Sequence, residues 1–294
     1  MRKQGKNLNV FLMDGTPSGR VKCTMANWTG VSYRIPRTAL ELCRERDDLK
    51  QSGVYFLFGT DEANGRDMVY IGQAGVRKMG EGILYRLQEH KRNPNNDYWV
   101  QAVVLTTSNN SFGQTEISFL EHHFYKLAKE CSRFNIKNAA EPSLGNITEE
   151  KESELFEFVE NAKVVMGVLG FKLFEPLIQI PQSIQQNINN DDLLLTLTRF
   201  SKKSKQQIQA QCKQTAEGFI VLKGSQIEQI DSQTIPTTIA ELRKNSSIIN
   251  GQLQENILFK SPSYAASFVL GGHVNGRIYW KDENGKTLKE LEQR

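Results

Sequence analysis

The segment that most constrains the fold of this chain is residues 52–72. Two apolar runs rich in Val, Tyr, Phe and Ile flank a polar stretch that contains Asp, Asn and glycine. Aromatic and β-branched residues favour strands, and turn-forming residues between two such runs predict a β-hairpin. Each predicted strand carries a tyrosine close to a glycine, Tyr55 in the first and Tyr70 in the second. We expect the fold to bring polar side chains from later in the chain close to these two tyrosines.

The chain after the hairpin predicts two helices with a strand between them. Residues 82–91 are typical of a helix, and Arg86 and His90 lie four positions apart, so their side chains share one helical face. Residues 99–106 have the β-branched content of a buried strand. Residues 115–131 carry apolar side chains at helical spacing. Together with the hairpin, these elements predict a mixed or antiparallel three-stranded sheet flanked by helices.

Within the second of these helices, Thr115 is the expected N-cap and Glu121 lies beside the apolar stripe. Glu116, five positions before Glu121, is an alternative acidic residue on the same helix.

The whole chain is predicted to be an α+β protein in four parts. Residues 51–145 form the unit described above, and residues 1–50 form an N-terminal extension of β-strands and a helix. Residues 146–190 are expected to be a helix followed by a Gln-, Asn- and Ser-rich linker. Residues 191–294 are expected to form a small accessory α/β module, which ends in a hairpin at residues 271–280 with an Asn-Gly turn.

Composition narrows the class of protein. The formal net charge of +4 and the pI near 8.7 permit a polyanionic partner. The four cysteines are scattered without a CxxC pair, which favours reduced thiols over disulfides or a zinc site. The N-terminus lacks the apolar core of a signal peptide, and no apolar run approaches the roughly 18 residues of a membrane span. A cytoplasmic protein without a membrane partner is expected.

The hairpin and the residues after it resemble the GIY-YIG nuclease superfamily. The first triplet, G-V-Y, ends at Tyr55 with valine in place of isoleucine, and the second, Y-I-G, begins at Tyr70. The later residues that match the superfamily pattern, in chain order, are Arg86, His90, Glu121 and Asn138. The resemblance covers roughly residues 52–138 and implies a metal-dependent endonuclease that hydrolyses phosphodiester bonds of DNA.

The resemblance also implies a role for each residue. Glu121 would hold one Mg²⁺, with Mn²⁺ as the alternative ion, because such cations prefer oxygen ligands and keep several waters. Arg86 would bind the non-bridging phosphate oxygens through its planar donor fork. Tyr55 would accept the proton of the attacking water or hold that water, since a nearby cation favours the phenolate. Tyr70 would position the water, and His90 would orient it or relay its proton.

Each of these residues taken singly has a structural alternative. Two tyrosines in strands are most often core or cross-strand residues, and Arg86 with His90 is typical of a solvated helix face. Asn138 alone would be a turn residue. The ordered combination of all six is what favours a nuclease site.

The predicted nucleic-acid contacts are basic residues in two regions. They are Arg77, Lys78, Lys91, Arg92, Lys202, Lys203 and Lys205. The C-terminal segment, through the run A-A-S-F-V-L-G that ends at Gly271 and through Trp280, resembles a small domain of unassigned role often appended to bacterial GIY-YIG proteins. The alternative function is a catalytically inactive nucleic-acid-binding or adaptor protein that retains the fold.

Overall fold

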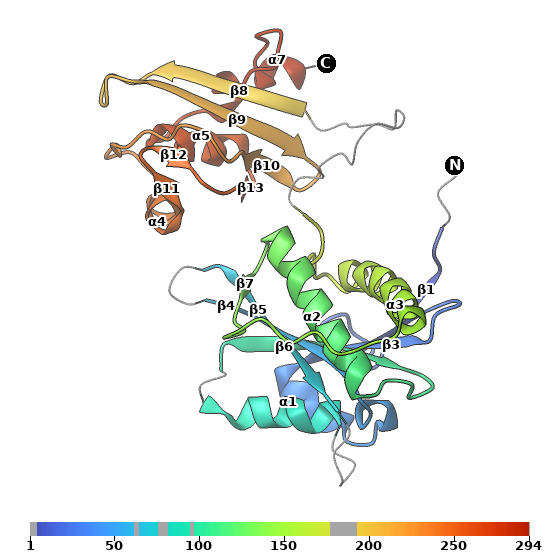
Figure 1. Ribbon diagram of the computed structural model, residues 1–294. Helices are drawn as coiled ribbons and strands as arrows, with labels where there is room; N and C mark the ends of the chain where they lie inside the picture. The colour runs from blue at the N-terminus through green and yellow to red at the C-terminus, as the bar shows by residue number, and fades with distance from the viewer. Residues whose placement is uncertain (1–4, 62–64, 76–81, 95–96, 177–192, 294) are drawn as a thin grey trace. The chain divides into compact units, whose positions relative to one another are not determined.

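The computed structural model describes residues 5–61, 65–75, 82–94, 97–176 and 193–293. The chain divides into two compact units, Met1–Pro176 and Leu177–Arg294 (Figure 1). Each unit has its own sheet and its own hydrophobic core. The helices in the described part of the chain do not combine the length and the apolar character that a membrane crossing requires.

The first unit is built on a seven-stranded sheet with the order β1-β2-β3-β6-β4-β5-β7. The strands are β1 (Leu8–Leu12), β2 (Val21–Met25), β3 (Gly30–Pro36), β4 (Gly53–Thr60), β5 (Asp67–Ala74), β6 (Trp99–Thr107) and β7 (Asn135–Ile136). All neighbouring strands are antiparallel except β5 and β7, which are parallel.

The predicted hairpin is present as β4 and β5, and the predicted third strand is β6. The prediction of a three-stranded sheet is wrong in extent. β6 pairs with β4 along one edge and with β3 along the other, so the N-terminal strands continue the same sheet. This long-range pairing satisfies the backbone groups of β6 on both edges, which a local pattern does not reveal.

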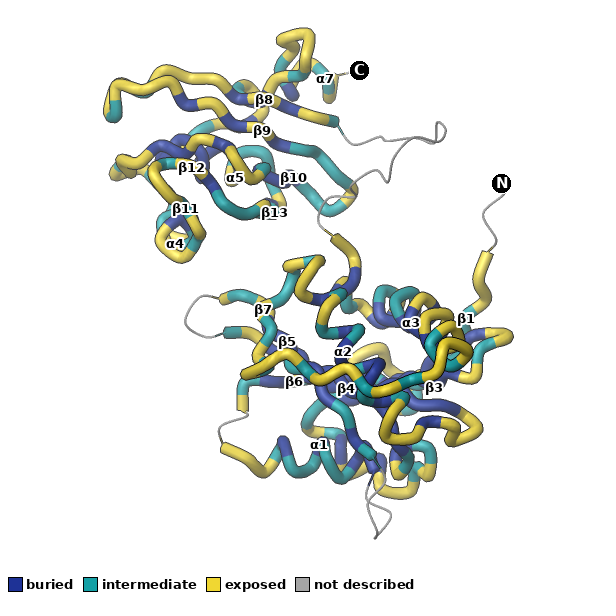
Figure 2. The backbone as a smooth tube through the Cα atoms, in the orientation of Figure 1, coloured by how far each residue is buried: buried dark blue, intermediate teal, exposed yellow. Residues whose placement is uncertain are grey.

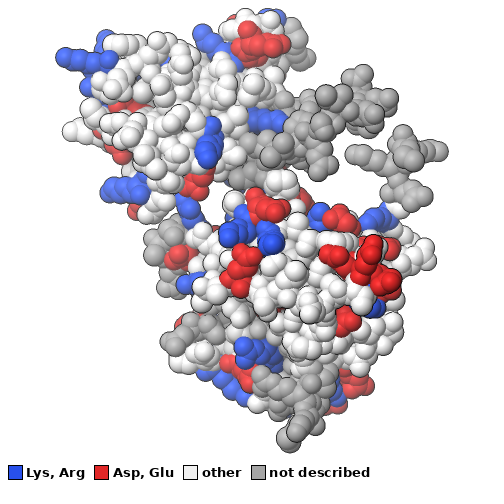
Figure 3. Space-filling view, in the orientation of Figure 1, with Lys and Arg blue, Asp and Glu red and all other residues white. Residues whose placement is uncertain are grey.

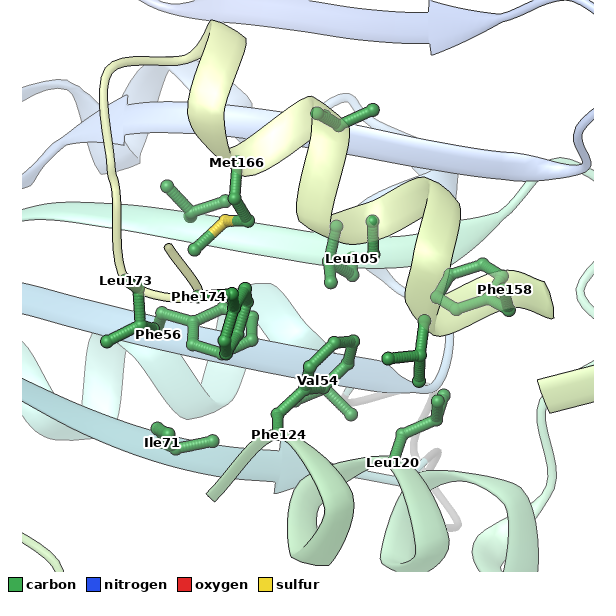
Figure 4. Packing of buried hydrophobic residues seen from close by; sticks show 14 of the residues in the cluster. Val54, Phe56, Ile71, Leu105, Leu120, Phe124, Phe158, Met166, Leu173 and Phe174 are labelled. Carbon is green, nitrogen blue, oxygen red and sulfur yellow. The ribbon is translucent and has the colours of Figure 1, made fainter. Parts of the chain in front are cut away.

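Helices cover both faces of this sheet. The helical elements are η1 (Arg37–Cys43), η2 (Asp47–Leu49), α1 (Ile83–Arg92), α2 (Gln114–Cys131) and α3 (Glu149–Val168), where η denotes a 3₁₀ helix. One core forms between the sheet and α2 and α3, where Phe56, Phe124 and Phe174 pack edge to face or stacked (Figure 4). The other core forms on the opposite face, where η1 and α1 pack.

Strand alternation decides which side chains of β4 meet which helices. Val54 and Phe56 belong to the core under α2 and α3, whereas Tyr55 and Leu57 belong to the core under α1. This alternation carries Tyr55 to the same side of the sheet as the helix that bears Arg86 and His90.

The N-terminus of α2 differs from the prediction by two residues. The N-cap is Gly113, and Thr115 lies inside the helix. Glu116 supplies the capping interaction, because its Oε2 accepts a hydrogen bond of 2.9 Å from the Gly113 backbone N–H. A carboxylate in the first turn suits both the unpaired amides and the helix dipole, so it replaces the predicted threonine.

The second unit contains a four-stranded antiparallel sheet with the order β13-β10-β9-β8, and a two-stranded ladder of β11 and β12. The strands are β8 (Leu193–Phe200), β9 (Gln207–Thr215), β10 (Gly218–Val221), β11 (Ile248–Ile249), β12 (Gln252–Leu253) and β13 (Ile257–Phe259). The helices are α4 (Thr237–Asn245), α5 (Pro262–Leu270), α6 (Gly276–Tyr279) and α7 (Leu288–Leu291). Phe268 and Trp280 are fully buried in its core.

The predicted hairpin at residues 271–280 is wrong. The Asn-Gly pair begins the short helix α6 instead of a turn, because the Asn275 side chain accepts a hydrogen bond of 3.1 Å from the Arg277 backbone N–H. An asparagine side chain can accept such a hydrogen bond at the start of a helix as readily as it can stabilise a turn. The buried Trp280 then donates from Nε1 to the Pro262 carbonyl at 3.0 Å, which holds the end of α6 against α5.

Candidate functional site

Two tyrosines and a histidine form a compact cluster between the sheet and α1. The Tyr55 hydroxyl and His90 Nε2 lie 2.8 Å apart. The rings of Tyr55 and Tyr70 have centroids 6.3 Å apart, and those of Tyr70 and His90 are 5.2 Å apart. Tyr55 is 1% exposed and His90 is 7% exposed, whereas Tyr70 is half-buried. The cluster is therefore packed on one side and reaches the surface near Tyr70.

Gly72 makes the position of the Tyr55 ring possible. The two residues are directly opposite in the β4–β5 ladder. A Cβ atom on Gly72 would lie 2.5 Å from Tyr55 Cζ, well inside the distance that real Cβ atoms allow. The Tyr55 ring therefore occupies the space that a side chain at position 72 would need.

Arg86 links this cluster electrostatically to a carboxylate from α2. Its Nη1 forms an ion pair of 2.7 Å with Glu89 Oε2, one helical turn away, and its side chain is 38% exposed. Its charge and a hydrogen bond to Tyr55 act to lower the pKa of Tyr55. The same charge acts to lower the pKa of Glu121. The guanidinium thus lies within electrostatic reach of both groups.

Glu121 is held by a residue that the sequence did not single out. Gln73 Nε2 donates to Glu121 Oε2 at 2.9 Å. The Gln73 Oε1 atom in turn accepts from Gln114 Nε2 at 3.0 Å and from Ser118 Oγ at 3.2 Å. This network fixes which end of the Gln73 amide faces the carboxylate. The available signal was its place in β5, three residues after Tyr70 and directly after Gly72.

Burial sets the protonation states of the cluster. Desolvation raises the pKa of Tyr55 well above its ordinary value, with a further contribution from Tyr70, although Arg86 opposes the shift. Desolvation, together with the charge of Arg86, lowers the pKa of His90 to about 4. Tyr55 is thus a neutral phenol and His90 a neutral imidazole near pH 7. The phenolate expected for Tyr55 is not favoured by the protein groups alone.

Glu121 is also affected by burial. Desolvation raises its pKa above the ordinary value, and the hydrogen bond from Gln73 and the charge of Arg86 partly offset that rise. Burial acts to lower the pKa of Arg86, but the hydrogen bonds and charge interactions with Glu89 and Tyr55 together outweigh burial and hold this pKa above the ordinary value.

Asn138 lies at the edge of the sheet and contacts backbone. Its Oδ1 accepts from the Ile71 N–H at 3.0 Å, and its Nδ2 donates to the Ile71 carbonyl at 2.7 Å. The side-chain amide therefore bonds to the backbone of Ile71 as a neighbouring strand would. Ile71 lies between Tyr70 and Gly72. Its contacts position β5 and do not reach Tyr55 or Glu121.

Glu116, the alternative acidic residue on α2, and the two histidines of this helix have local partners. Glu116 caps its own helix, as described above. His122 Nδ1 lies 2.6 Å from the Pro142 carbonyl. His123 stacks on Phe119 and meets the edge of Phe156. These contacts place the three residues in helix capping and packing, separate from the tyrosine cluster.

The donor chemistry of the site fits only one type of metal ion. Within the described residues, no three His, Cys, Asp or Glu side chains are grouped closely enough to enclose an ion. Of the two carboxylates described near the cluster, Glu89 is already paired with Arg86, and Glu121 has one oxygen that accepts from Gln73. One carboxylate suits a hard cation that keeps most of its waters and takes further oxygens from a phosphate, as Mg²⁺ does.

The predicted nucleic-acid contacts are placed differently from one another. Arg77 and Lys78 lie outside the described residues. Lys91 is half-buried, and the guanidinium of Arg92 lies 6.0 Å from the Tyr85 ring centroid. In the view of Figure 3, basic and acidic side chains are interspersed on each unit, without one large field of a single sign.

In the second unit, Lys202 and Lys205 are exposed. Lys203 is exposed as well, but its Nζ donates to the Ile230 and Gly271 carbonyls, at 3.3 and 3.4 Å. Of the three predicted lysines, it is the one with a structural role in its own unit.

Comparison with known proteins gives a match in the second unit. Residues 200–292 match DUF4357, a domain of unknown function, over the segment from β9 to α7. No curated protein and no solved structure matches the chain. The match agrees with the predicted appended C-terminal domain of unassigned role, and the second unit therefore contains a domain similar to DUF4357.

Proposed function

We propose that the first unit is a GIY-YIG-type endonuclease that hydrolyses phosphodiester bonds of DNA with the help of a divalent cation. The observation that carries the proposal is the convergence of residues far apart in sequence. Tyr55 and His90 share a hydrogen bond, and Arg86 acts electrostatically on both Tyr55 and Glu121. A proton-transfer pair, a fixed positive charge and a carboxylate are the groups that phosphodiester hydrolysis requires.

The hydrogen bond between Tyr55 and His90 supports a proton relay in which His90 is protonated only transiently, because its lowered pKa disfavours a lasting imidazolium. His90 Nε2 accepts the Tyr55 hydroxyl proton when the imidazole carries its own proton on Nδ1. The Tyr55 oxygen can then take a proton from the attacking water while its own proton passes to His90. The water oxygen forms the new bond to phosphorus, and the bond to the leaving oxygen breaks. In this scheme Tyr55 needs no standing negative charge, which its raised pKa would oppose.

Arg86 and Glu121 act on the phosphate. The exposed part of the Arg86 side chain can donate to non-bridging oxygens, where negative charge develops during the reaction. Glu121 would hold the cation, whose role is to polarise the phosphate and stabilise the leaving oxygen. Gln73 keeps the carboxylate in one orientation. The exposed lysines Lys202 and Lys205 would add sequence-independent contacts to the DNA backbone.

The test is cleavage of plasmid DNA and of single-stranded, double-stranded and branched oligonucleotides with Mg²⁺, Mn²⁺ or EDTA. Wild-type protein should cleave at least one substrate in a metal-dependent way. Glu121→Ala and Arg86→Ala should each lower the rate by about 100-fold or more. Glu116→Gln is the matched control, because this carboxylate lies on the same helix but caps its N-terminus.

Two outcomes would contradict the proposal. Cleavage that persists in both Glu121→Ala and Arg86→Ala would show that the assigned groups are not the active site. Binding of DNA without cleavage of any substrate would indicate the alternative, a nucleic-acid-binding or adaptor protein.

A further inference from the structure

Strand β1 is an edge strand with exposed apolar side chains. It stands at one end of the seven-stranded order and pairs with β2 alone among the described strands (Figure 1). Val10, Phe11 and Leu12 are 43%, 57% and 36% exposed, and the strand appears largely as an exposed segment of the tube in Figure 2. A strand of this kind presents unpaired backbone groups to solvent.

The hydrogen bonds at the two ends of the β1–β2 ladder show which residues face outward. Met13 N–H donates to the Arg20 carbonyl, and Ala26 N–H donates to the Asn7 carbonyl. Backbone groups alternate between the two edges of an antiparallel strand. The odd-numbered residues of β1 therefore bond to β2, and Leu8, Val10 and Leu12 direct their N–H and C=O groups to the open edge.

The long edge strand of the second unit is treated differently. The N–H and carbonyl of Thr196, near the middle of β8, exchange hydrogen bonds with Lys281, which covers that edge. The edge strands at the other side of each sheet, β7 and β13, have only two and three residues. Natural edges are protected by covering segments, shortness, charge or proline. The segment Leu8–Leu12 contains no charged residue and no proline.

We propose that β1 pairs with β1 of a second copy of this chain, antiparallel and around a two-fold axis at Val10. In this register Val10 faces Val10 of the second copy, and Leu8 faces Leu12. The outward-facing residues read Leu, Val, Leu in either direction, so the same edge complements itself. Each of the three residue pairs exchanges two backbone hydrogen bonds, and the two seven-stranded sheets become one.

The side chains favour this occupant over an unrelated strand. Leu8, Val10 and Leu12 lie on the face of the sheet that carries Val21 and Cys23, their buried partners in β2. A two-fold axis perpendicular to the sheet keeps that face common to both copies, so the exposed Val10 and Leu12 gain apolar neighbours. A charged or polar partner strand would leave these side chains without such contacts.

The first test is sedimentation equilibrium of the full chain over a concentration series. The wild-type protein should form dimers. Val10→Pro should raise the dimer dissociation constant at least about tenfold, because it removes two hydrogen bonds between the copies and leaves the β1–β2 ladder intact. Val10→Lys should have a similar effect through charge repulsion at the seam. Leu144→Lys, at another exposed apolar residue outside the strands, should leave dimerisation unchanged.

The second test fixes the register. Under mild oxidation Val10→Cys should form an intermolecular disulfide, because facing residues in this pairing have Cα atoms about 5.5 Å apart. Phe11→Cys should react more slowly, since position 11 faces position 9 of the other copy. A wild-type protein that stays monomeric at all concentrations would overturn the proposal. So would dimers that persist in folded Val10→Pro and Val10→Lys, or that cross-link through position 11 and not through position 10.

Discussion

The two units differ in the partners of their buried polar groups. In the second unit Arg243 is 9% exposed, and its guanidinium donates to the Phe268 and Glu228 carbonyls and pairs with Asp231 Oδ1 at 2.8 Å. In the first unit Tyr55 and His90 are also buried, but they contact each other and lie beside the partly exposed Arg86. The polar groups around Arg243 bond mainly to the backbone of their own unit, whereas those around Tyr55 lie next to a side chain that reaches the surface.

The difference distinguishes a network that stabilises its unit from the candidate site, where we propose proton transfer. The acceptors around Arg243 are two backbone carbonyls and a carboxylate, so the network ties α4 to α5 and to the segment before α4. Around Tyr55, burial shifts pKa values of neighbouring groups in opposite directions, upward for Tyr55 and downward for His90. Groups whose pKa values are separated by their surroundings are typical of sites that move protons.

The largest expected effect distinguishes the two networks by activity. Tyr55→Phe should lower the DNA cleavage rate about 1,000-fold, because the relay oxygen is lost. The free energy of unfolding of this variant should fall by only about 1–2 kcal/mol, since the hydrogen bonds of the hydroxyl to His90 and Arg86 are lost while the ring still packs. Tyr33→Phe is a matched control: Tyr33 is also fully buried and donates to Asp48, away from the cluster. Equal rates for the two variants would place Tyr55 among packing residues.

The second prediction concerns stability. Arg243→Met should lower the free energy of unfolding of the second unit by about 3 kcal/mol, because buried acceptors lose a charged donor. The Trp280 environment reports on this unit during urea unfolding, since that side chain is fully buried there. Cleavage of DNA by the folded variant should stay unchanged. A large loss of activity without loss of stability would mean that the network around Arg243 is not purely structural.

The third prediction uses the lowered pKa of His90. In the unfolded chain the imidazole takes a proton near pH 6.5, but in the folded protein only near pH 4, so the unfolded state binds more protons between these values. Stability of the first unit should therefore fall as the pH drops from 6.5 to 4, by about 2 kcal/mol after allowance for solvent screening. Hydrogen exchange of β4 and β5 over this range measures the change.

Glu121 complicates this measurement because its raised pKa acts with the opposite sign. Its folded carboxyl keeps a proton at pH values where the unfolded one has lost it, so its contribution falls as pH rises through that range. The comparison is cleanest between Glu121→Gln and the double variant with His90→Gln. An identical pH slope in both proteins would show that His90 does not titrate as stated.

The smallest expected effect is at the sheet edge. Asn138→Ala should cost about 1 kcal/mol in stability of the first unit, because its two hydrogen bonds to the backbone N–H and C=O of Ile71 are replaced by hydrogen bonds to water. The cleavage rate should fall less than in Tyr55→Phe, since the Asn138 amide does not reach the cluster. Asn135→Ala, at an exposed position of β7, is a suitable control. A rate loss as large as that of Tyr55→Phe would place Asn138 in direct contact with the substrate.

Local patterns predicted the elements around the site well. The alternation and turn residues of 52–72 correspond to β4 and β5, and helical spacing located α1 and α2. Pairings between distant segments were not predictable in the same way. The sequences of β3 and β6 alone do not show that these strands pair, because the hydrogen bonds between them join backbone groups that every such residue has. The hairpin expected at residues 271–280 failed because an asparagine serves equally well in a turn and as a helix cap.

The candidate site shows the same division. The four-residue spacing of Arg86 and His90 predicted a shared helical face, but the contact between His90 and Tyr55 depends on how α1 docks on the sheet. Gln73 and Glu89 were missed because their value comes from partners, Glu121 and Arg86, that only the folded chain brings to them. The protonation states depend on burial, which residue spacing does not give.

Gly72 has a consequence for how the site can be rebuilt. The Tyr55 ring fills the volume opposite this glycine, so the residue at position 55 and the residue at position 72 depend on each other although they lie on different strands. Grafting the tyrosine onto another antiparallel hairpin would require a residue without a side chain directly across the ladder. Conversely, an alanine at position 72 would displace the ring from His90 while leaving every polar group of the site in the sequence. The smallest residue of the cluster is therefore the one that a transplanted site can least do without.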